Sequence, residues 1–264
     1  MGVLLDRVKP VSPWIRRELE LSKTLKRGDR NRSVYNVQEW LSLRGLRVVV
    51  DGDFGSATQA AVRAFQKKSR LQADGVVGRK TYEALVAPLR TVLAPLPAGS
   101  KTFADLTLAY AKRHLAQHPL EVGGQNCGPW VRLYTEGHEG NDWPWCAGFV
   151  SFLMKQAAHT LGVPMPIAGS VSCDTLAAQA RAAGLFVRDA DIRNGNVPLG
   201  TMPTASIFLS RRTNTDWTHT GLVTSFDKSM FHTIEGNTND EGSREGYEVC
   251  ARMRGYADKD FIRL

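Results

Sequence analysis

The residue best placed for chemistry is Cys146, which follows Pro144 and Trp145 and opens an almost wholly apolar run, CAGFVSFLM. Because proline restrains the chain just before this run, the pattern predicts a buried helix that begins at or just before Cys146. A thiol at a helix N-terminus lies at the positive end of the helix dipole, which lowers its pKa and favours the nucleophilic thiolate. A buried structural cysteine is the competing interpretation, and the local sequence leaves both open.

A base and its partners could come from three segments with strand character, residues 205–209, 218–223 and 231–237. The second segment carries His219, and the third carries Glu235 and Asn237. Since side chains alternate between the faces of a strand, Glu235 and Asn237 should point the same way. An imidazole, a carboxylate and an amide on neighbouring strands could meet a cysteine on a facing helix, giving a nucleophile, a base and an orienting group. A single strand histidine is more often structural, and His232 fits that description.

Two other groups of residues could bind a metal. His114 and His118 have the i, i+4 spacing of a zinc pair, but no Glu follows the first and no third His lies nearby in sequence. That context favours two polar residues near a helix end. Glu139, Asn141 and Asp142 form an oxygen-rich loop before the apolar run, which keeps calcium open as an alternative.

The four cysteines also limit the chemistry. They are Cys127, Cys146, Cys173 and Cys250, and none has C-x-x-C spacing, so a structural zinc site is not expected. Four cysteines in 264 residues are too few for a disulfide scaffold. Cys127 is the rival nucleophile, although no comparable apolar helix follows it. We therefore expect no metal and no cofactor, with calcium as the alternative.

The elements that would position these residues can be outlined. Helices are expected over residues 103–117 and 126–134, with Pro129 in the first turn of the second. Residues 87–100 contain three prolines and little polar periodicity. Proline at this density disfavours both helix and sheet, so the segment is predicted to be a semi-rigid linker.

An internal repeat precedes that segment. Residues 51–58 and 74–81 both have the pattern D-G-x-x-G-x-x-T, and each leads into an apolar-periodic helix. Asp-Gly favours a tight turn, and Ser56 with Gln59 fits a capping box at the start of the next helix. A further short helix is expected around Val37 and Leu41, ended by Gly45. The pattern therefore predicts a small three-helix unit of about 65 residues.

Positive charge is concentrated in the same part of the chain. The net formal charge is +8, and residues 1–100 hold 18 Lys/Arg against 9 Asp/Glu, a net of +9, whereas the remainder has a net of −1. This asymmetry suits a module that binds an anionic polymer, such as nucleic acid, anionic lipid or cell wall. It does not choose among them.

The N-terminal pattern resembles the peptidoglycan-binding domain found at the ends of many wall hydrolases. The resemblance runs from Glu18 to Leu89 and rests on LKRGDRNRSVYNVQEWL, DGDFGSATQAAVRAFQ and ADGVVGRKTYEAL. Residues 30–33 depart from the family as an insertion before the helix, where they could lengthen a loop that touches ligand.

The C-terminal motifs resemble the CHAP family of cysteine, histidine-dependent amidohydrolases/peptidases. The matching pieces are P-W-C-A-x-F-V, I-F-L, T-H-T-G-L-V and I-E-G-N, in the family's order, between Leu106 and Ile262. The resemblance implies a papain-like fold, with Cys146 as nucleophile, His219 as base, Glu235 as its orienting partner and Asn237 as support.

Together these patterns predict two domains. Residues 1–90 should form a small all-α three-helix peptidoglycan-binding domain, and residues 91–100 a Pro-rich linker. Residues 101–264 should form an α+β papain-like domain, in which a central helix packs on an antiparallel sheet.

The two resemblances imply a peptidoglycan hydrolase of the endolysin kind that cleaves an amide bond with a cysteine nucleophile. Either N-acetylmuramoyl-L-alanine amidase or peptide endopeptidase activity would fit. A secreted antibacterial effector of the same chemistry and a non-catalytic wall-binding or virion structural protein are the alternatives. A nucleic-acid binder would suit the basic charge, but the sequence has no recognition motif for one. The expected partner is peptidoglycan, with no nucleic acid, no membrane insertion and a monomeric chain.

The expected location follows from the N-terminal residues. Asp6 and Arg7 interrupt the chain after five residues, so no apolar core of a secretory signal is present, and no run approaches the about 20 apolar residues of a membrane span. We expect a protein made in the host cytoplasm without a signal peptide, which acts on the wall in the periplasm after release.

Overall fold

The computed structural model describes residues 2–5, 11–239 and 246–264. Asp6 and Arg7, on which the expected absence of a signal peptide rests, lie outside these ranges. The helical elements are α1 (Pro13–Leu19), α2 (Arg32–Leu43), α3 (Ser56–Lys68), α4 (Arg79–Leu85), α5 (Ala87–Leu93), α6 (Phe103–Gln117), α7 (Pro129–Tyr134), α8 (Cys146–Leu161), α9 (Cys173–Ala182), α10 (Asp189–Arg193) and the 3-10 helix η1 (Leu199–Thr201). The strands are β1 (Phe186–Val187), β2 (Ile207–Thr213), β3 (Asp216–Phe226), β4 (Met230–Thr238), β5 (Glu248–Gly255) and β6 (Lys259–Ile262).

The repeat in the N-terminal part is explained by two buried glutamines. In each D-G-x-x-G-x-x-T copy, the amide of a glutamine from the preceding helix donates to the aspartate that opens the copy and to the threonine that ends it. The pairs are Gln38 with Asp51 (2.8 Å) and Thr58 (3.1 Å), and Gln66 with Asp74 (2.8 Å) and Thr81 (3.2 Å). The two turns thus share one hydrogen-bond pattern, which fixes α2, α3 and α4 against each other.

Two local predictions for this part were wrong. Ser56 is the first residue of α3 and not its cap, because the N-cap is Gly55, which makes no side-chain cap bond. Residues 30–33 do not simply lengthen a loop. Asn31 caps α2 by accepting a hydrogen bond from Val34 N, and the helix begins at Arg32.

The predicted linker is helical at its start. Pro88 lies in the first turn of α5, where its missing N–H costs no helical hydrogen bond, so proline did not prevent a helix there. Leu89, Val92 and Leu93 are fully buried, and α5 packs against α6. Of the predicted linker 91–100, only residues 94–100 lack helix and strand.

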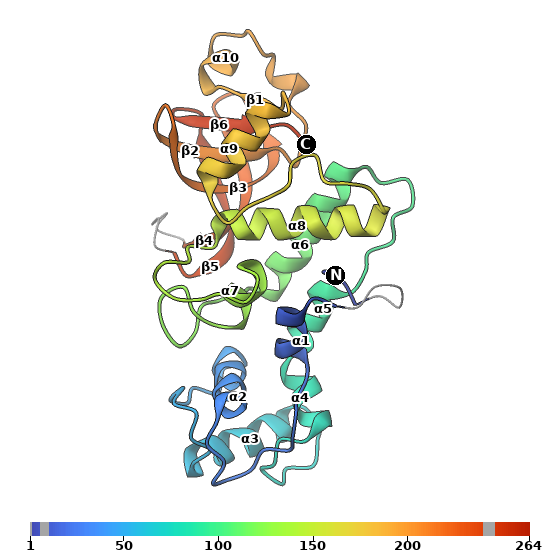
Figure 1. Cartoon of the computed structure of the whole chain (residues 1–264), viewed down its shortest axis with the longest axis vertical. Helices are drawn as coiled ribbons and strands as arrows, with labels where there is room; N and C mark the ends of the chain where they lie inside the picture. Colours follow the sequence, from blue (N-terminus) through green and yellow to red (C-terminus); the bar gives the residue numbers. More distant parts are fainter. Residues whose placement is uncertain (1, 6–10, 240–245) are drawn as a thin grey trace.

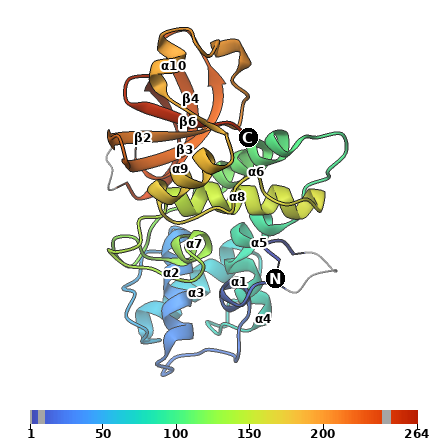
Figure 2. The ribbon, with the colours of Figure 1, turned by 45° about the horizontal axis from the view of Figure 1, so that its top comes forward.

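The C-terminal part is an α+β structure, as predicted. One six-stranded sheet has the order β1-β6-β2-β3-β4-β5, and each neighbouring pair is antiparallel. The apolar helix α8 packs against β3 and β4 on one side and against α6 on another. In both views α6 and α8 lie between the sheet and the N-terminal helices (Figures 1 and 2).

The two parts are joined by a buried ion-pair cluster as well as by the chain. Arg132 in α7 donates to both carboxylate oxygens of Glu18 from α1 (2.7 and 3.0 Å) and of Glu39 from α2 (3.0 and 2.8 Å). It also pairs with Glu139 (2.5 Å). The main apolar core is continuous across this junction, from Val3 to Ile262. Among the described residues, no helix is long and apolar enough to cross a membrane.

Candidate active site

Cys146 is the first residue of α8, as the proline-led apolar run predicted. Only 5% of the residue is exposed. The helix start is held from both sides, because the Trp145 indole stacks on Tyr134 with ring centroids 5.4 Å apart and donates from Nε1 to Glu121 (2.8 Å). The backbone N–H of Trp145 donates to Asn237 Oδ1 (3.3 Å). These contacts fix the start of the helix that carries the thiol, which packs against β3 and β4.

His219 on β3 is bound to Glu235 on the neighbouring strand β4. The His219 Nε2–Glu235 Oε2 distance is 2.8 Å, and both residues are buried. Burial disfavours the imidazolium, but Cys146 and Glu235 outweigh that effect and raise the pKa of His219 to about 9. Nδ1 is buried and forms no hydrogen bond to any described residue. With Nε2 committed to Glu235, Nδ1 is the ring nitrogen that remains for proton exchange with the thiol.

The thiol of Cys146 is strongly acidified. Its pKa is held well below the usual value, first by Cys173, whose Sγ lies 3.9 Å from the Sγ of Cys146, and then by His219 and the backbone N–H of Ala147. These effects outweigh burial, which acts in the opposite direction. A thiolate beside an imidazolium is the nucleophilic form of such a pair.

The carboxylate of Glu235 is fully engaged. Oε1 accepts from Thr233 Oγ1 (2.5 Å) and Arg254 Nε (2.9 Å), and Oε2 accepts from His219 Nε2 and Arg254 Nη2 (2.5 Å). Burial would raise the pKa of Glu235, but Arg254 and His219 lower it to about 2. Glu235 is therefore ionised at any physiological pH and can stabilise a charged His219.

Asn237 lies in the same site but has a different contact. Its side-chain oxygen accepts a hydrogen bond from the backbone N–H of Trp145, just before α8. The simple alternation expected along this strand does not extend to Asn237, because the register of β4 against β5 shifts between Glu235 and Thr238 and Asn237 has a φ of +56°. The structure thus places Glu235 on the histidine and Asn237 on the helix that carries the cysteine.

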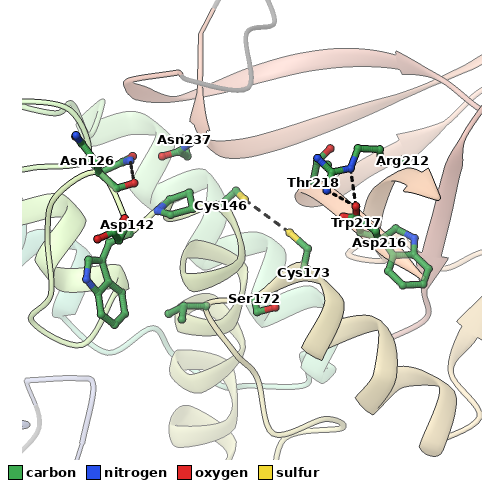
Figure 3. Close-up of a pocket in the computed structure, with 14 residues that line it drawn as sticks. Asn126, Asp142, Cys146, Ser172, Cys173, Arg212, Asp216, Trp217, Thr218 and Asn237 are labelled. Atoms are coloured by element: carbon green, nitrogen blue, oxygen red, sulfur yellow. Dashed lines mark hydrogen bonds and ion pairs between the residues drawn. The ribbon is translucent and has the colours of Figure 1, made fainter. Parts of the chain in front are cut away.

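The thiol faces an open cavity of about 400 Å³ (Figure 3). Figure 3 shows Cys146 and Cys173 at its centre, Asn126, Asp142 and Asn237 on one side, and the Arg212–Asp216 ion pair on the other. The side chains that line it are Asn126, Asn141, Asp142, Trp143, Pro144, Cys146, Val171, Ser172, Cys173, Arg212, Asp216, Trp217, Thr218 and Asn237. A cavity of this size, with polar and aromatic walls, can take a short segment of a peptide or glycopeptide.

The rival thiol lies in a different environment. Burial raises the pKa of Cys127, and the carboxylates of Glu139, Glu121 and Glu39 raise it further. A thiol whose pKa is raised carries less thiolate at neutral pH. The electrostatics therefore favour Cys146 over Cys127 as the nucleophile.

The two candidate metal sites are occupied by other contacts. His114 is fully buried between Tyr134 Oη (2.8 Å) and Gln156 Oε1 (3.0 Å), and burial lowers its pKa to about 3. His118 binds Glu248 (2.6 Å). Glu139 pairs with Arg132 and with Arg32 (2.7 Å). Within the described ranges, no three His, Cys, Asp or Glu side chains form a group that could hold a metal ion.

Three residues of the site were not predicted from the sequence. Cys173 begins α9, and no role in the site was expected of it. Arg254 is on β5, for which no strand was predicted. Gly221 allows β3 and β4 to approach, since a Cβ there would lie 2.6 Å from Glu235 Cγ. The glycine in T-H-T-G was a signal available in the sequence; the other two residues had none.

Comparison with known proteins finds similar solved structures and a matching family. Among solved structures, the chain is similar to a peptidoglycan-binding protein from Clostridioides difficile in complex with glutamine hydroxamate (41% identity, 24% of this chain and 40% of that chain, TM-score 0.24). It is also similar to the Burkholderia AP3 phage endolysin (36% identity, 39% of this chain and 40% of that chain, TM-score 0.25). The matched region thus spans less than half the length of each solved chain. Residues 30–85 match the family described as "Putative peptidoglycan binding domain", which confirms the N-terminal resemblance derived from the repeat.

Proposed function

We propose that this protein is a peptidoglycan hydrolase that cleaves an amide bond with Cys146 as nucleophile. The observation that carries the proposal is the buried set of an acidified thiol, a charged imidazole and an ionised carboxylate, in which the thiol faces an open cavity. The match of residues 30–85 to a peptidoglycan-binding domain supports the cell wall as the place where it acts. Anchoring on an insoluble polymer would keep the cavity close to its substrate.

The geometry supports a mechanism in two stages. The Cys146 thiolate attacks the amide carbonyl carbon, and backbone N–H groups at the start of α8 would stabilise the oxyanion of the tetrahedral intermediate. His219 then gives its Nδ1 proton to the leaving amine, which leaves a thioester acyl-enzyme. A water molecule transfers a proton to Nδ1 as it attacks the thioester, and the carboxylic acid product departs with the thiolate restored.

We further propose that the C-terminal part has the papain-like arrangement of the CHAP family. The support is a cysteine at the start of an apolar helix that packs on an antiparallel sheet, with the histidine and its carboxylate on adjacent strands. Both N-acetylmuramoyl-L-alanine amidase and peptide endopeptidase activities fit this chemistry. Mass spectrometry of digested peptidoglycan distinguishes them, because an amidase leaves muramic lactyl ends free of peptide and an endopeptidase leaves shortened stem peptides.

An endolysin is the setting that we propose for this activity. The protein would be made in the host cytoplasm, act as a monomer and reach the wall after release. A secreted effector would use the same site. A non-catalytic wall-binding or virion protein would have no use for an acidified thiol, and an assay that measures both binding and cleavage distinguishes it from an enzyme.

The test compares Cys146→Ser with Cys127→Ser as the matched control. Cys146→Ser should abolish the release of soluble fragments from purified peptidoglycan, because a serine hydroxyl is not acidified as the thiol is. It should still sediment with peptidoglycan, since the residues that match the binding domain are untouched. Cys127→Ser should keep its activity. If Cys146→Ser cleaves as fast as the wild type, or if the wild type binds without cleaving, the proposed function is wrong.

A further inference from the structure

Arg254 binds the candidate site through Glu235. It lies on β5, and its guanidinium meets Glu235 as a two-pronged pair, Nε to Oε1 (2.9 Å) and Nη2 to Oε2 (2.5 Å). The Arg254 side chain is only 18% exposed and also lies over the Phe208 ring, 5.8 Å from its centroid. Arg254 is not among the described residues that line the cavity.

The charges of the site explain why such a residue would be needed. With Cys146 as thiolate, His219 as imidazolium and Glu235 as carboxylate, the buried set has a net charge of −1. Charge that is buried without compensation is costly, and a carboxyl group in that position tends to take up a proton. The Arg254 guanidinium brings the buried set to neutrality.

Other titratable groups near Glu235 cannot replace Arg254. Cys146 faces the set from α8 and His219 from β3, and Cys250 is paired with Glu235 across β4 and β5. Lys259 on β6 is another cation near Glu235, but its ammonium donates to the backbone oxygen of Ala257 and not to the carboxylate. Arg254 is the cation that binds the carboxylate directly.

We propose that Arg254 is a positioning residue of the active site, which keeps Glu235 charged and oriented so that Glu235 can hold His219 in its productive state. The inference rests on the proposed function, because that function makes Glu235 part of an active site. The choice of Arg254 rests on its contacts with Glu235. Thr233 fixes one oxygen of the carboxylate, and Arg254 fixes both. A planar guanidinium matches a carboxylate with two parallel bonds, whereas a lysine ammonium offers a single point of charge.

The test measures the thiolate directly, through the rate at which iodoacetamide alkylates Cys146 as a function of pH, followed by mass spectrometry of the peptide that contains Cys146. Arg254→Gln removes the charge and should let Glu235 take up a proton at mildly acidic pH. The lower limb of the alkylation profile should then move upward by on the order of one pH unit. Arg252→Gln is the matched control, because Arg252 lies two residues away on the same strand and loses the same charge. Its profile should follow the wild type.

Arg254→Lys separates charge from geometry. It should keep the lower limb near that of the wild type, but cleavage of peptidoglycan should fall about tenfold or more, because one ammonium cannot orient both oxygens. A purely structural role would lower the melting temperature of the Arg254 variants and leave the alkylation profile unchanged, which would overturn the inference. If Arg254→Gln does not fold, Arg254→Lys provides the test. Cleavage at the wild-type rate by Arg254→Lys would also overturn the inference. Alkylation needs no peptidoglycan, so a shifted profile in a protein that cleaves nothing would refute the proposed function and leave the role of Arg254 standing.

Discussion

At the scale of single residues, the structure separates two neighbours that the sequence could not. Glu235 and Asn237 are two positions apart on β4, and both were expected near His219. Glu235 binds the imidazole and Asn237 binds the backbone that leads into α8. In the proposed mechanism, the carboxylate therefore acts on the base, and the amide supports the start of the helix that carries the nucleophile.

This difference predicts the effects of replacing each residue. Glu235→Gln should lower turnover by at least about 10²-fold, toward the about 10⁴-fold loss seen when the equivalent carboxylate of a serine protease triad is neutralised. Because Glu235 helps to raise the pKa of His219 to about 9, the upper limb of the pH–rate profile should move to lower pH. Asn237→Ala should cost less and leave that limb in place. A dead Asn237→Ala beside a near-normal Glu235→Gln would reverse the two roles.

Gly221 is a single residue whose size decides how closely two strands can pack. At the scale of elements, β3 and β4 come so close there that an added Cβ would lie 2.6 Å from Glu235 Cγ, 2.8 Å from Phe208 Cε1 and 3.1 Å from Ile234 O. The backbone oxygen cannot move aside without disturbing the strand pairing. The glycine therefore makes room for the carboxylate in the site.

Gly221→Ala should lower both stability and activity. Overpacking of this kind costs about 1–3 kcal/mol of unfolding free energy, and a displaced Glu235 should reduce cleavage more than the loss of stability explains. Gly255→Ala in β5 is the matched control, because an added Cβ there meets no atom within 4 Å. Urea unfolding and peptidoglycan cleavage would be measured on both. Equal behaviour of the two variants would contradict the argument.

Some elements could be predicted from the sequence and others could not. The helices at Phe103–Gln117 and Cys146–Leu161 were predicted because apolar periodicity or a proline-led apolar run marks them. The strands that carry His219 and Glu235 were predicted because β-branched and apolar residues gather there. β5 escaped prediction because its outward face carries Ala251 and Met253 and its inward face carries arginines, which conceals the usual apolar alternation. Arg254 was missed with it, since only the strand pairing brings it to Glu235.

At the scale of the whole molecule, the N-terminal helices and the C-terminal α+β part share one core. Trp40 from α2 meets Trp130 from α7 edge to face, with ring centroids 6.0 Å apart. Beside them, Arg132 takes Glu18 and Glu39 as buried partners from the N-terminal helices. Burial has the largest effect on the pKa of Glu39 and raises it. The ion pair with Arg132 acts in the opposite direction and stabilises the charged carboxylate. Sequence spacing could not reveal this junction, because Arg132 lies 93 positions from Glu39 and 114 from Glu18.

A cut in the segment 94–100 tests this shared core. A protease site placed there and cleaved should yield two pieces that still elute together from a sizing column, because the junction holds them without the chain. The fragment 101–264 made alone should aggregate or melt well below the full chain, since Arg132 loses two buried partners, a change that costs about 3–5 kcal/mol for one such pair. Two pieces that separate and each melt as the intact protein does would mean independent domains.

The same junction bears on how the protein would move over a wall. If a flexible linker joined the two parts, one bound molecule could reach every substrate bond within the length of that linker. Because the N-terminal helices pack onto the C-terminal part, the cavity would instead lie at a fixed distance and direction from the point where the N-terminal helices bind the wall. Each landing then offers only the bonds at that distance and direction, and the next bond requires the N-terminal helices to let go. Residence time on the polymer, rather than the chemical step, would set the pace, and a version that grips the wall more tightly would digest it more slowly.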